Sequence, residues 1–160
     1  MSFINKSVST IAPHLALGVL GERLAKKHLQ KQGYRIVVTN LKMHLGRGVT
    51  GQPLTGEIDI VAYDKDILCF VEVKTLTSAD IVSPEAKVNL AKQRQIVRTA
   101  KRYRQMLSLI GEACRYDVVS VVMADEKRPS IELKRSYFTE EGLRKRAYAW
   151  ERQPGYGFQD

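Results

Sequence analysis

The sequence predicts an α/β fold in which a central mixed five-stranded sheet is flanked by helices. The periodic segments occur in the order helix, three strands, helix, two strands and short helix. The chain has 160 residues, 44% hydrophobic and 27% charged, which is ordinary for one domain with its own core. Without repeats or an internal linker, we expect a flexible tail over residues 1–13, a single domain over 14–150 and a C-terminal tail over 151–160.

The first expected element is a helix from His14 to Gln32. Pro13 suits its first turn, and Gly33 is well placed to end it. Glycine costs helix stability, so Gly18 and Gly21 indicate that the helix backbone closely approaches another element, such as the sheet.

A strand is expected next, from Tyr34 to Leu41. Residues 42–55 contain three glycines and a proline, and we expect them to form a mobile polar loop. Lys42 and Arg47 on this loop are candidates for contacts with a nucleic-acid backbone.

The stretch from Gly56 to Thr75 is predicted to form a β-hairpin, because two runs of good strand formers flank a polar turn over residues 64–66. A turn centred between Lys65 and Asp66 places Asp59 directly opposite Glu72. Because side chains alternate along a strand, one face would carry Glu57, Asp59, Val61, Phe70, Glu72 and Lys74, and the other would be apolar throughout.

The polar hairpin face has a chemical interpretation. Opposed strand residues have Cβ atoms roughly 5 Å apart, so Asp59 and Glu72 would repel each other unless a cation lies between them. A hard divalent ion such as Mg²⁺ fills this role, and Lys74 could then position water or neutralise phosphate. The alternative is an ordinary half-solvated hairpin. A second Glu-x-Lys, at Glu132 and Lys134, has no acid opposite it.

Glu22 on the first helix is a further candidate. It precedes Ala25 and Leu29 by three and seven residues, so it borders the buried stripe and could reach toward the hairpin acids. Two alternatives stay open: a favourable acid in an early helical turn, or an ion pair with Lys26 at i+4.

A long basic helix is expected from Pro84 to Ile110. Between Ala86 and Gly111 there is no acid, whereas solvated helix faces usually mix charge signs. A phosphate-rich partner explains this better than solvation alone. The nucleic-acid-binding candidates on it are Lys87, Lys92, Arg94, Arg98, Lys101 and Arg102. Lys92 and Gln93, near the start of this helix, could also point back toward the carboxylates.

The rest of the chain completes the sheet. Residues 116–124 are expected to form a buried strand and residues 130–138 an outer strand, and Thr139 is expected to cap a short final helix.

The net charge of the chain limits the kinds of partner that it can bind. The formal net charge of +9 and the pI of about 9.7 favour a polyanion: nucleic acid first, an anionic membrane surface second. The alternative is simply a basic soluble protein. No apolar run approaches the roughly 20 residues that span a bilayer, and the first residues lack the pattern of a signal peptide. We therefore expect a cytoplasmic protein with no membrane partner.

Five motifs in collinear order, over about Leu17 to Val122, resemble the YraN-type proteins: LGVLGERLAKKHLQKQGYRIVVTN, GEIDIVA, FVEVKT, PEAKVNLAKQRQI and RYDVV. These are small bacterial proteins, mostly uncharacterised, with the restriction-endonuclease-like (PD-(D/E)xK) fold, a three-layer sandwich. They are distantly similar to archaeal Holliday-junction resolvases. Two departures concern substrate contacts: a longer loop before GEID, and Leu76 where the family often has Arg.

The resemblance implies roles residue by residue. Asp59 and Glu72 match the metal-binding acids, and Lys74 matches the motif lysine. Glu22 matches the first-helix glutamate of resolvase-like members, and the carbonyl of Val73 is a further metal ligand in that fold. The implied cofactor is Mg²⁺ or Mn²⁺.

The resulting hypothesis is a metal-dependent DNA endonuclease that selects branched DNA by shape. DNA is favoured over RNA as the substrate, and a homodimer is expected because resolvase-like members cut paired strands. The alternative is a catalytically silent nucleic-acid-binding protein that keeps the nuclease fold. An RNA-directed enzyme is a third, less favoured, hypothesis.

Overall fold

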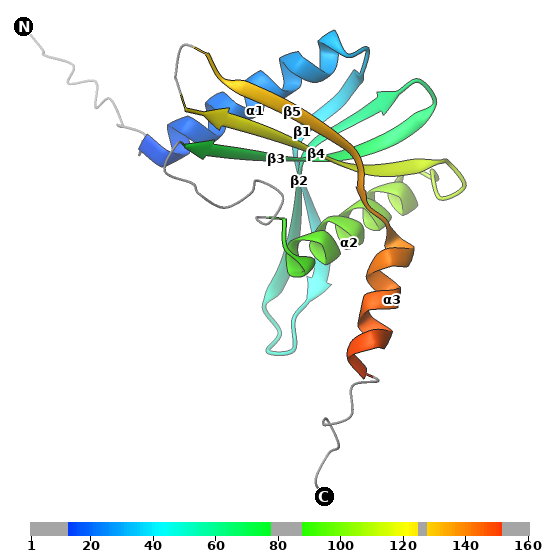
Figure 1. Ribbon diagram of the computed structural model, residues 1–160. Coiled ribbons are helices and arrows are strands. Elements are labelled where there is room, and N and C mark those ends of the chain that lie inside the picture. Colours follow the sequence, from blue (N-terminus) through cyan, green and yellow to red (C-terminus); the bar gives the residue numbers. More distant parts are fainter. Residues whose placement is uncertain (1–12, 78–87, 125–127, 152–160) are drawn as a thin grey trace, which may run out of the picture.

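The computed structural model describes residues 13–77, 88–124 and 128–151, with the backbone alone for 13–14 and 147–151 (Figure 1). Apart from Pro13 and Glu151, which lie in helices, the two predicted tails fall outside these residues. The elements are α1 (Pro13–Lys31), β1 (Arg35–Arg47), β2 (Pro53–Asp64), β3 (Ile67–Thr77), α2 (Leu90–Met106), β4 (Cys114–Met123), β5 (Ser130–Phe138) and α3 (Glu140–Glu151). Their order is the predicted one.

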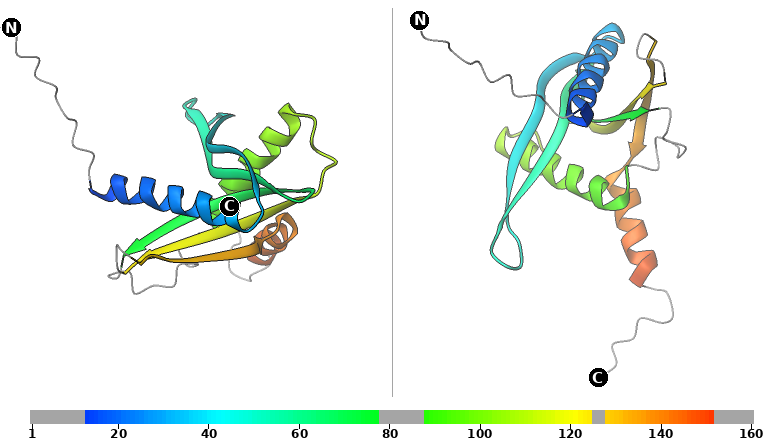
Figure 2. Two further views of the ribbon diagram at one scale, coloured as in Figure 1. Left: turned by 90° about the horizontal axis from the view of Figure 1, so that it is seen from above. Right: turned by 90° about the vertical axis from the view of Figure 1, so that its left-hand side faces the viewer.

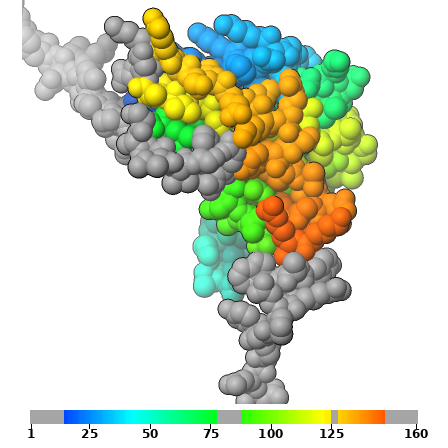
Figure 3. All heavy atoms as spheres, in the orientation of Figure 1, coloured from blue at the N-terminus to red at the C-terminus, as the bar shows by residue number. Residues whose placement is uncertain are grey.

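The five strands form one mixed sheet in the order β1-β2-β3-β4-β5. β3 and β4 are parallel, and the other neighbouring pairs are antiparallel. α1 packs on one face and α2 on the other, and α3 packs beside α2 (Figures 2 and 3). The predicted three-layer α/β sandwich is confirmed. Within the described ranges, no helix has the length and apolar character needed to cross a bilayer.

Both faces of the sheet carry an apolar core. On the α1 side, Ala25 and Leu29 are fully buried against the inward side chains of β2, β3 and β4. On the α2 side, the ring of Phe70 packs edge-on to Tyr103 at 6.0 Å and stacks on Tyr116 at 5.8 Å. Burying one such side chain contributes about 1.5–3 kcal/mol. The hairpin face predicted to be polar is therefore largely core, and its acids gather at one end.

The predicted mobile loop over residues 42–55 is wrong. β1 continues to Arg47 and β2 begins at Pro53, so a two-stranded ribbon extends from the sheet (Figure 1). The sequence carried a sign of this strand, because the apolar Met43 stands between two polar residues. The structure buries Met43 and exposes both neighbours. Gly46 has φ +115° at an irregularity in the pairing, where it marks a β-bulge and not a loop.

α2 is shorter than predicted at both ends. It starts at Leu90, because the side chain of Asn89 caps it by accepting a hydrogen bond from the Lys92 N–H at 3.0 Å. It stops at Met106. The predicted end at Ile110 is wrong: Leu107 and Ile110 lie beyond the helix and are about half exposed. Ala86 and Lys87 lie outside the described residues.

The C-terminal end of α2 is closed by its own side chains. The Arg104 guanidinium donates to the carbonyls of Ile110 at 2.6 Å and Glu112 at 3.1 Å, which satisfies oxygens beyond the helix end. At the other end of the chain, Thr139 caps α3 as predicted: its Oγ1 accepts a hydrogen bond from the Gly142 N–H at 3.0 Å.

The two glycines of α1 differ. Gly21 is buried, and a Cβ added there would lie 2.9 Å from the Cβ of Thr75 on β3, so only glycine fits. The predicted close approach of helix and sheet is confirmed at this position. It is wrong for Gly18, where an added Cβ would meet nothing within 4 Å.

We expect Gly21→Ala to destabilise the protein by about 1–2 kcal/mol, because overpacking costs about 1–3 kcal/mol and outweighs the gain in helix propensity. Gly18→Ala is the matched control, and it should be neutral or stabilise by up to about 1 kcal/mol. Urea unfolding of the three proteins measures the difference. Equal stabilisation by both substitutions would contradict the close packing at Gly21.

Candidate active site

The candidate site forms where β2 and β3 separate. The two strands are paired from Asp64 and Ile67 at the turn to Ile60 and Val71, which confirms the predicted register. Asp59 and Glu72 are the next residue on each strand, directly beyond the last pair. Beyond this point β2 stays paired with β1 while β3 stays paired with β4. The two acids therefore lie at an opening within the sheet.

Glu72 is the most buried acid of the site, with 2% of its surface exposed. Its Oε1 lies 2.7 Å from the Nζ of Lys74, and its Oε2 lies 3.2 Å from the Nζ of Lys92. Oε2 is buried and accepts no hydrogen bond of good geometry. A buried carboxylate is costly without paired cations, and here two lysines supply the charge while one oxygen keeps capacity to bind.

Asp59 lies beside Glu72 and is mostly buried. Its Oδ2 accepts a hydrogen bond from the Val73 N–H at 2.7 Å, which orients the carboxylate across the opening. Burial, then the charges of Glu72 and Glu22, raise the pKa of Asp59 to about 7, against the lowering effects of the Val73 N–H and Lys92. The carboxylate is thus held in an environment that disfavours its charge and would favour a nearby cation.

Glu22 reaches the same place from α1. With Asp59 it lines a hollow of about 240 Å³ between α1, β1 and β2, and Gly21 allows the close approach. The structure describes both Glu22 and Lys26 and places no ion pair between them. The hollow brings together the helix acid and the first hairpin acid.

Arg23 and Lys26 line this hollow too, and sequence reasoning missed them as site residues. Their signal was present, because they follow Glu22 at one and four residues in a helix. They put positive charge beside Glu22 and Asp59.

Ser120 was also missed. It is the strand neighbour of Lys74 across the β3–β4 pair, so both side chains project from the same face of the sheet. Ser120 is 1% exposed, and its Oγ has no hydrogen-bond partner. The one signal in the sequence was a hydroxyl among valines.

Because an unpartnered buried hydroxyl costs stability, we expect Ser120→Ala to be neutral or to stabilise the protein by up to about 1 kcal/mol. Thr99→Val is the comparison, since the Thr99 hydroxyl is buried but donates to the Gln95 carbonyl at 2.8 Å. Losing that bond should cost about 1 kcal/mol. Urea unfolding should move the two midpoints in opposite directions, and equal losses would contradict the assignment.

The predicted nucleic-acid contacts divide into two groups. Several are engaged within the chain: Lys92 binds Glu72, Lys101 lies 2.9 Å from Glu140, and Lys42 lies 3.0 Å from the carboxylate of Glu57. Glu57, predicted to share a face with Asp59 and Glu72, is exposed on the ribbon and pairs with Lys42. Lys92 points back toward the carboxylates, which was one of the two roles considered for it, beside contact with nucleic acid.

The second group faces solvent. Arg94, Arg98 and Arg102 are exposed on α2. Arg47 is exposed on the ribbon, where it donates to the Gly51 carbonyl at 3.0 Å and stiffens the turn. Lys87 lies outside the described residues.

The donors at the opening fit a hard divalent cation. They are the carboxylate oxygens of Asp59 and Glu72, a ligand type that Mg²⁺ and Mn²⁺ take, and Glu72 Oε2 accepts no hydrogen bond of good geometry. Among the described residues, no three Asp, Glu, His or Cys side chains lie close enough together to hold a metal ion. Mg²⁺ does not require three such side chains, because it usually keeps waters and substrate phosphate as ligands beside one or two carboxylates.

Comparisons with known proteins agree with the family read from the sequence. The profile of the uncharacterised protein family UPF0102 matches residues 21–121. A UPF0102 protein of Alkaliphilus metalliredigens is 40% identical over 113 residues, or 71% of this chain and 90% of the relative. One of Chlorobaculum tepidum is 40% identical over 106 residues, or 66% and 74%. A solved structure described as "Crystal structure of SSO0001" aligns with a TM-score of 0.43 and 16% identity, covering 90% of this chain and 63% of that one.

Proposed function

This chain belongs to the UPF0102 family, and we propose that it is a metal-dependent endonuclease that hydrolyses phosphodiester bonds in DNA. One observation carries the proposal. Asp59 on β2 lies between two other acids: it lines a hollow with Glu22 of α1 and lies near Glu72 of β3, whose carboxylate binds Lys74 and Lys92. Clustered carboxylates beside amines are what phosphoryl chemistry with a hard cation requires.

The residues that would hold the ion are Asp59, Glu72, the carbonyl of Val73 and Glu22. When bound, Mg²⁺ or Mn²⁺ would neutralise charge on the scissile phosphate and lower the pKa of water. The chain itself supplies the orientation: the Val73 N–H fixes Asp59, and the two lysines fix Glu72.

Lys74 has a second role in the proposal. Its side chain is about one-fifth exposed, at 22%, so its ammonium reaches the opening while it holds Glu72. An ammonium in this position can orient an attacking water and stabilise negative charge that develops on the phosphate. Arg23 and Lys26 on the α1 side would bind the neighbouring backbone.

The alternative is a nucleic-acid-binding protein that makes no cut. One observation favours it: Lys74 and Lys92 already neutralise Glu72 without any metal ion. Against it, a pure binder gains nothing from three acids next to DNA, because like charges lower affinity. Burial, then the charges of Glu72 and Glu22, raise the pKa of Asp59, and the opposing effects of Lys92 and the Val73 N–H do not offset them.

The proposed substrate is DNA recognised by shape. Exposed cations lie on α1, α2, α3 and the ribbon, and phosphate contacts from such side chains position a nucleic acid without reading its sequence. Branched DNA is the preferred class, and two copies of the chain acting together would cut paired strands.

A cleavage assay tests the proposal. Labelled four-way junctions, flaps, duplexes and single strands are incubated with the protein in Mg²⁺, in Mn²⁺ or in EDTA. Cutting that depends on the metal and favours a branched form is the expected result. Binding to these DNAs with no cutting in either metal would support the silent binder instead.

A further inference from the structure

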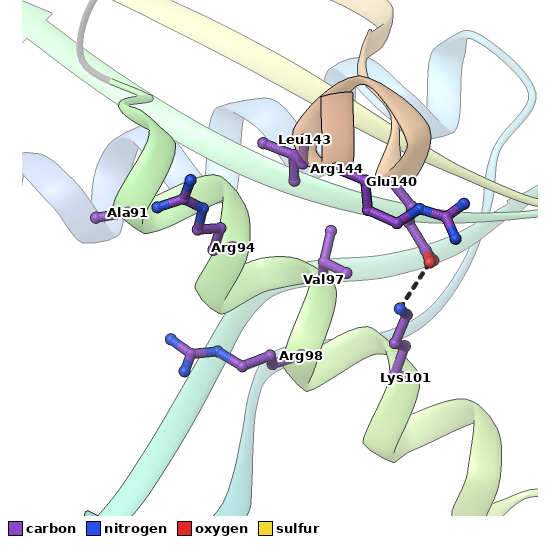
Figure 4. Close-up of a pocket in the computed structure, with 8 residues that line it drawn as sticks. All are labelled: Ala91, Arg94, Val97, Arg98, Lys101, Glu140, Leu143 and Arg144. Carbon is purple, nitrogen blue, oxygen red and sulfur yellow. Dashed lines mark ion pairs between the residues drawn. The ribbon is translucent and has the colours of Figure 1, made fainter. Parts of the chain in front are cut away.

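A groove of about 560 Å³ lies between α2 and α3, away from the acids (Figure 4). Its floor is apolar, formed by Ala91, Val97 and Leu143. Its charged lining consists of Arg94, Arg98, Lys101, Glu140 and Arg144. The groove therefore combines a flat apolar strip with basic walls.

Most of the positive charge in the groove is not used by the fold. Glu140, the acid in the lining, is already bound by Lys101 at 2.9 Å and by the Tyr116 hydroxyl at 2.7 Å. Among the described residues, no acid pairs with Arg94, Arg98 or Arg144, and all three are exposed. Three guanidinium groups of the groove lining therefore have no acidic partner among the described residues and are open to an anionic ligand.

The groove continues toward the candidate active site. A second hollow of about 360 Å³, between α2 and the β1–β2 ribbon, shares Ala91 and Arg98 with it and is also lined by Lys92. Lys92 in turn lies 3.2 Å from Glu72. Ala91 is exposed and small, so a chain could pass over the start of α2 from the groove to the acids.

We propose that the α2–α3 groove binds a single-stranded segment of nucleic acid and leads it toward the acids. This inference rests on the proposed function and names the form of its substrate: a DNA with an unpaired arm next to the cutting point. The phosphates of the strand lie on the three arginines, and its bases lie on the apolar floor.

The combination of floor and walls selects a single strand. A duplex presents phosphates outward and keeps its bases stacked inside, so it would contact the arginines and leave the apolar floor empty. An unpaired strand exposes base faces that pack on apolar and guanidinium surfaces while its backbone follows the basic wall.

The test measures binding in EDTA, so that no cutting is needed. Fluorescence anisotropy gives the Kd of a labelled single strand of about 16 nucleotides, the upper end of typical site sizes, and of a hairpin duplex of the same composition. The groove variant is Arg94→Ala/Arg144→Ala. The matched control is Lys145→Ala/Arg146→Ala, which removes the same charge from exposed positions of α3 outside the groove lining.

We expect the wild-type protein to prefer the single strand, and the groove variant to lose about 10- to 100-fold in single-strand affinity. The control should lose only the few-fold that a change in net charge causes. Equal losses in both variants, or a groove variant that loses duplex affinity just as much, would overturn the inference. An acidic apolar protein segment would then be the better occupant.

The outcome separates the two proposals. Single-strand binding through the groove with no cleavage of any DNA would leave the groove assignment standing and refute the endonuclease. Metal-dependent cleavage with unchanged single-strand binding in the groove variant would refute the groove alone.

Discussion

Asp59→Asn and Glu72→Gln should each lower the rate of metal-dependent DNA cleavage by about 1,000-fold or more. Both substitutions keep the side-chain size and remove a charged oxygen donor from the opening between β2 and β3. A bound metal ion supplies several kcal/mol of transition-state stabilisation, and each 1.4 kcal/mol is a factor of ten in rate. Single-turnover cleavage of a branched DNA at saturating protein measures the chemical step, so that losses of affinity do not contribute.

The chain offers a matched control for each variant. Glu57→Gln changes an acid two residues from Asp59 that is exposed and bound to Lys42, outside the opening. Glu132→Gln changes the acid of the second Glu-x-Lys, which lies 3.9 Å from Lys134 on β5. Both controls should cut at close to the wild-type rate. Equal losses in the controls would show that overall charge, and not this site, governs cleavage.

Asp59→Asn should also stabilise the metal-free protein at pH 8. Burial and the charges of Glu72 and Glu22 raise the pKa of Asp59 to about 7 in the folded state, from 3.8 for a free aspartate, although Lys92 and the Val73 N–H oppose the shift. The folded protein therefore binds a proton more tightly than the unfolded chain. The free energy of unfolding falls as the pH rises from about 4 to 7, and it levels off above that.

The neutral amide removes this pH-dependent loss. We expect a gain of about 1–3 kcal/mol at pH 8 and almost none near pH 4, since the wild-type carboxyl is protonated there in the folded state. For a chain of this size the gain corresponds to a rise in Tm of roughly 2–4 °C per kcal/mol. Thermal unfolding in EDTA across this pH range measures it. A loss of stability at pH 8 would show that the Asp59 charge is already balanced by the lysines.

Together, these two expectations predict opposite effects of Asp59→Asn on cleavage and on stability. The substitution that stops cleavage would be the one that makes the protein more stable, which is typical of sites that hold like charges together for a ligand. Glu57→Gln should do neither, because its carboxylate is exposed and paired.

Local patterns in the sequence predicted the hairpin and its register. Strand side chains alternate with a fixed period, and one polar turn between two apolar runs leaves little choice of pairing, so Asp59 and Glu72 could be placed opposite each other. The close approach at Gly21 followed from the cost of glycine in a helix.

The features that the sequence did not predict depend on contacts between distant segments of the chain. The opening at Asp59 exists because β2 follows β1 while β3 follows β4, and no local pattern reports those pairings. The position of Ser120 beside Lys74 depends on the parallel pairing of β3 with β4. Glycines in residues 42–55 suggested a loop, but tertiary pairing of the ribbon overrode that preference.

The α2–α3 groove was hidden for the same reason. Arg144 and Leu143 belong to a short helix far along the chain, and their packing against α2 creates the floor and one wall. The basic residues of α2 could be recognised in the sequence, but the α3 surface that packs beside them could not.

Direct metal binding tests the central claim. Mn²⁺ is titrated into the protein in the presence of a branched DNA, with electron paramagnetic resonance of free Mn²⁺ as the readout, for the wild type, Asp59→Asn and Glu57→Gln. We expect stoichiometric binding by the wild type and Glu57→Gln, with at least a tenfold loss of affinity in Asp59→Asn. Binding that is absent in the wild type, or equal in all three proteins, would contradict a metal centre at the opening between β2 and β3.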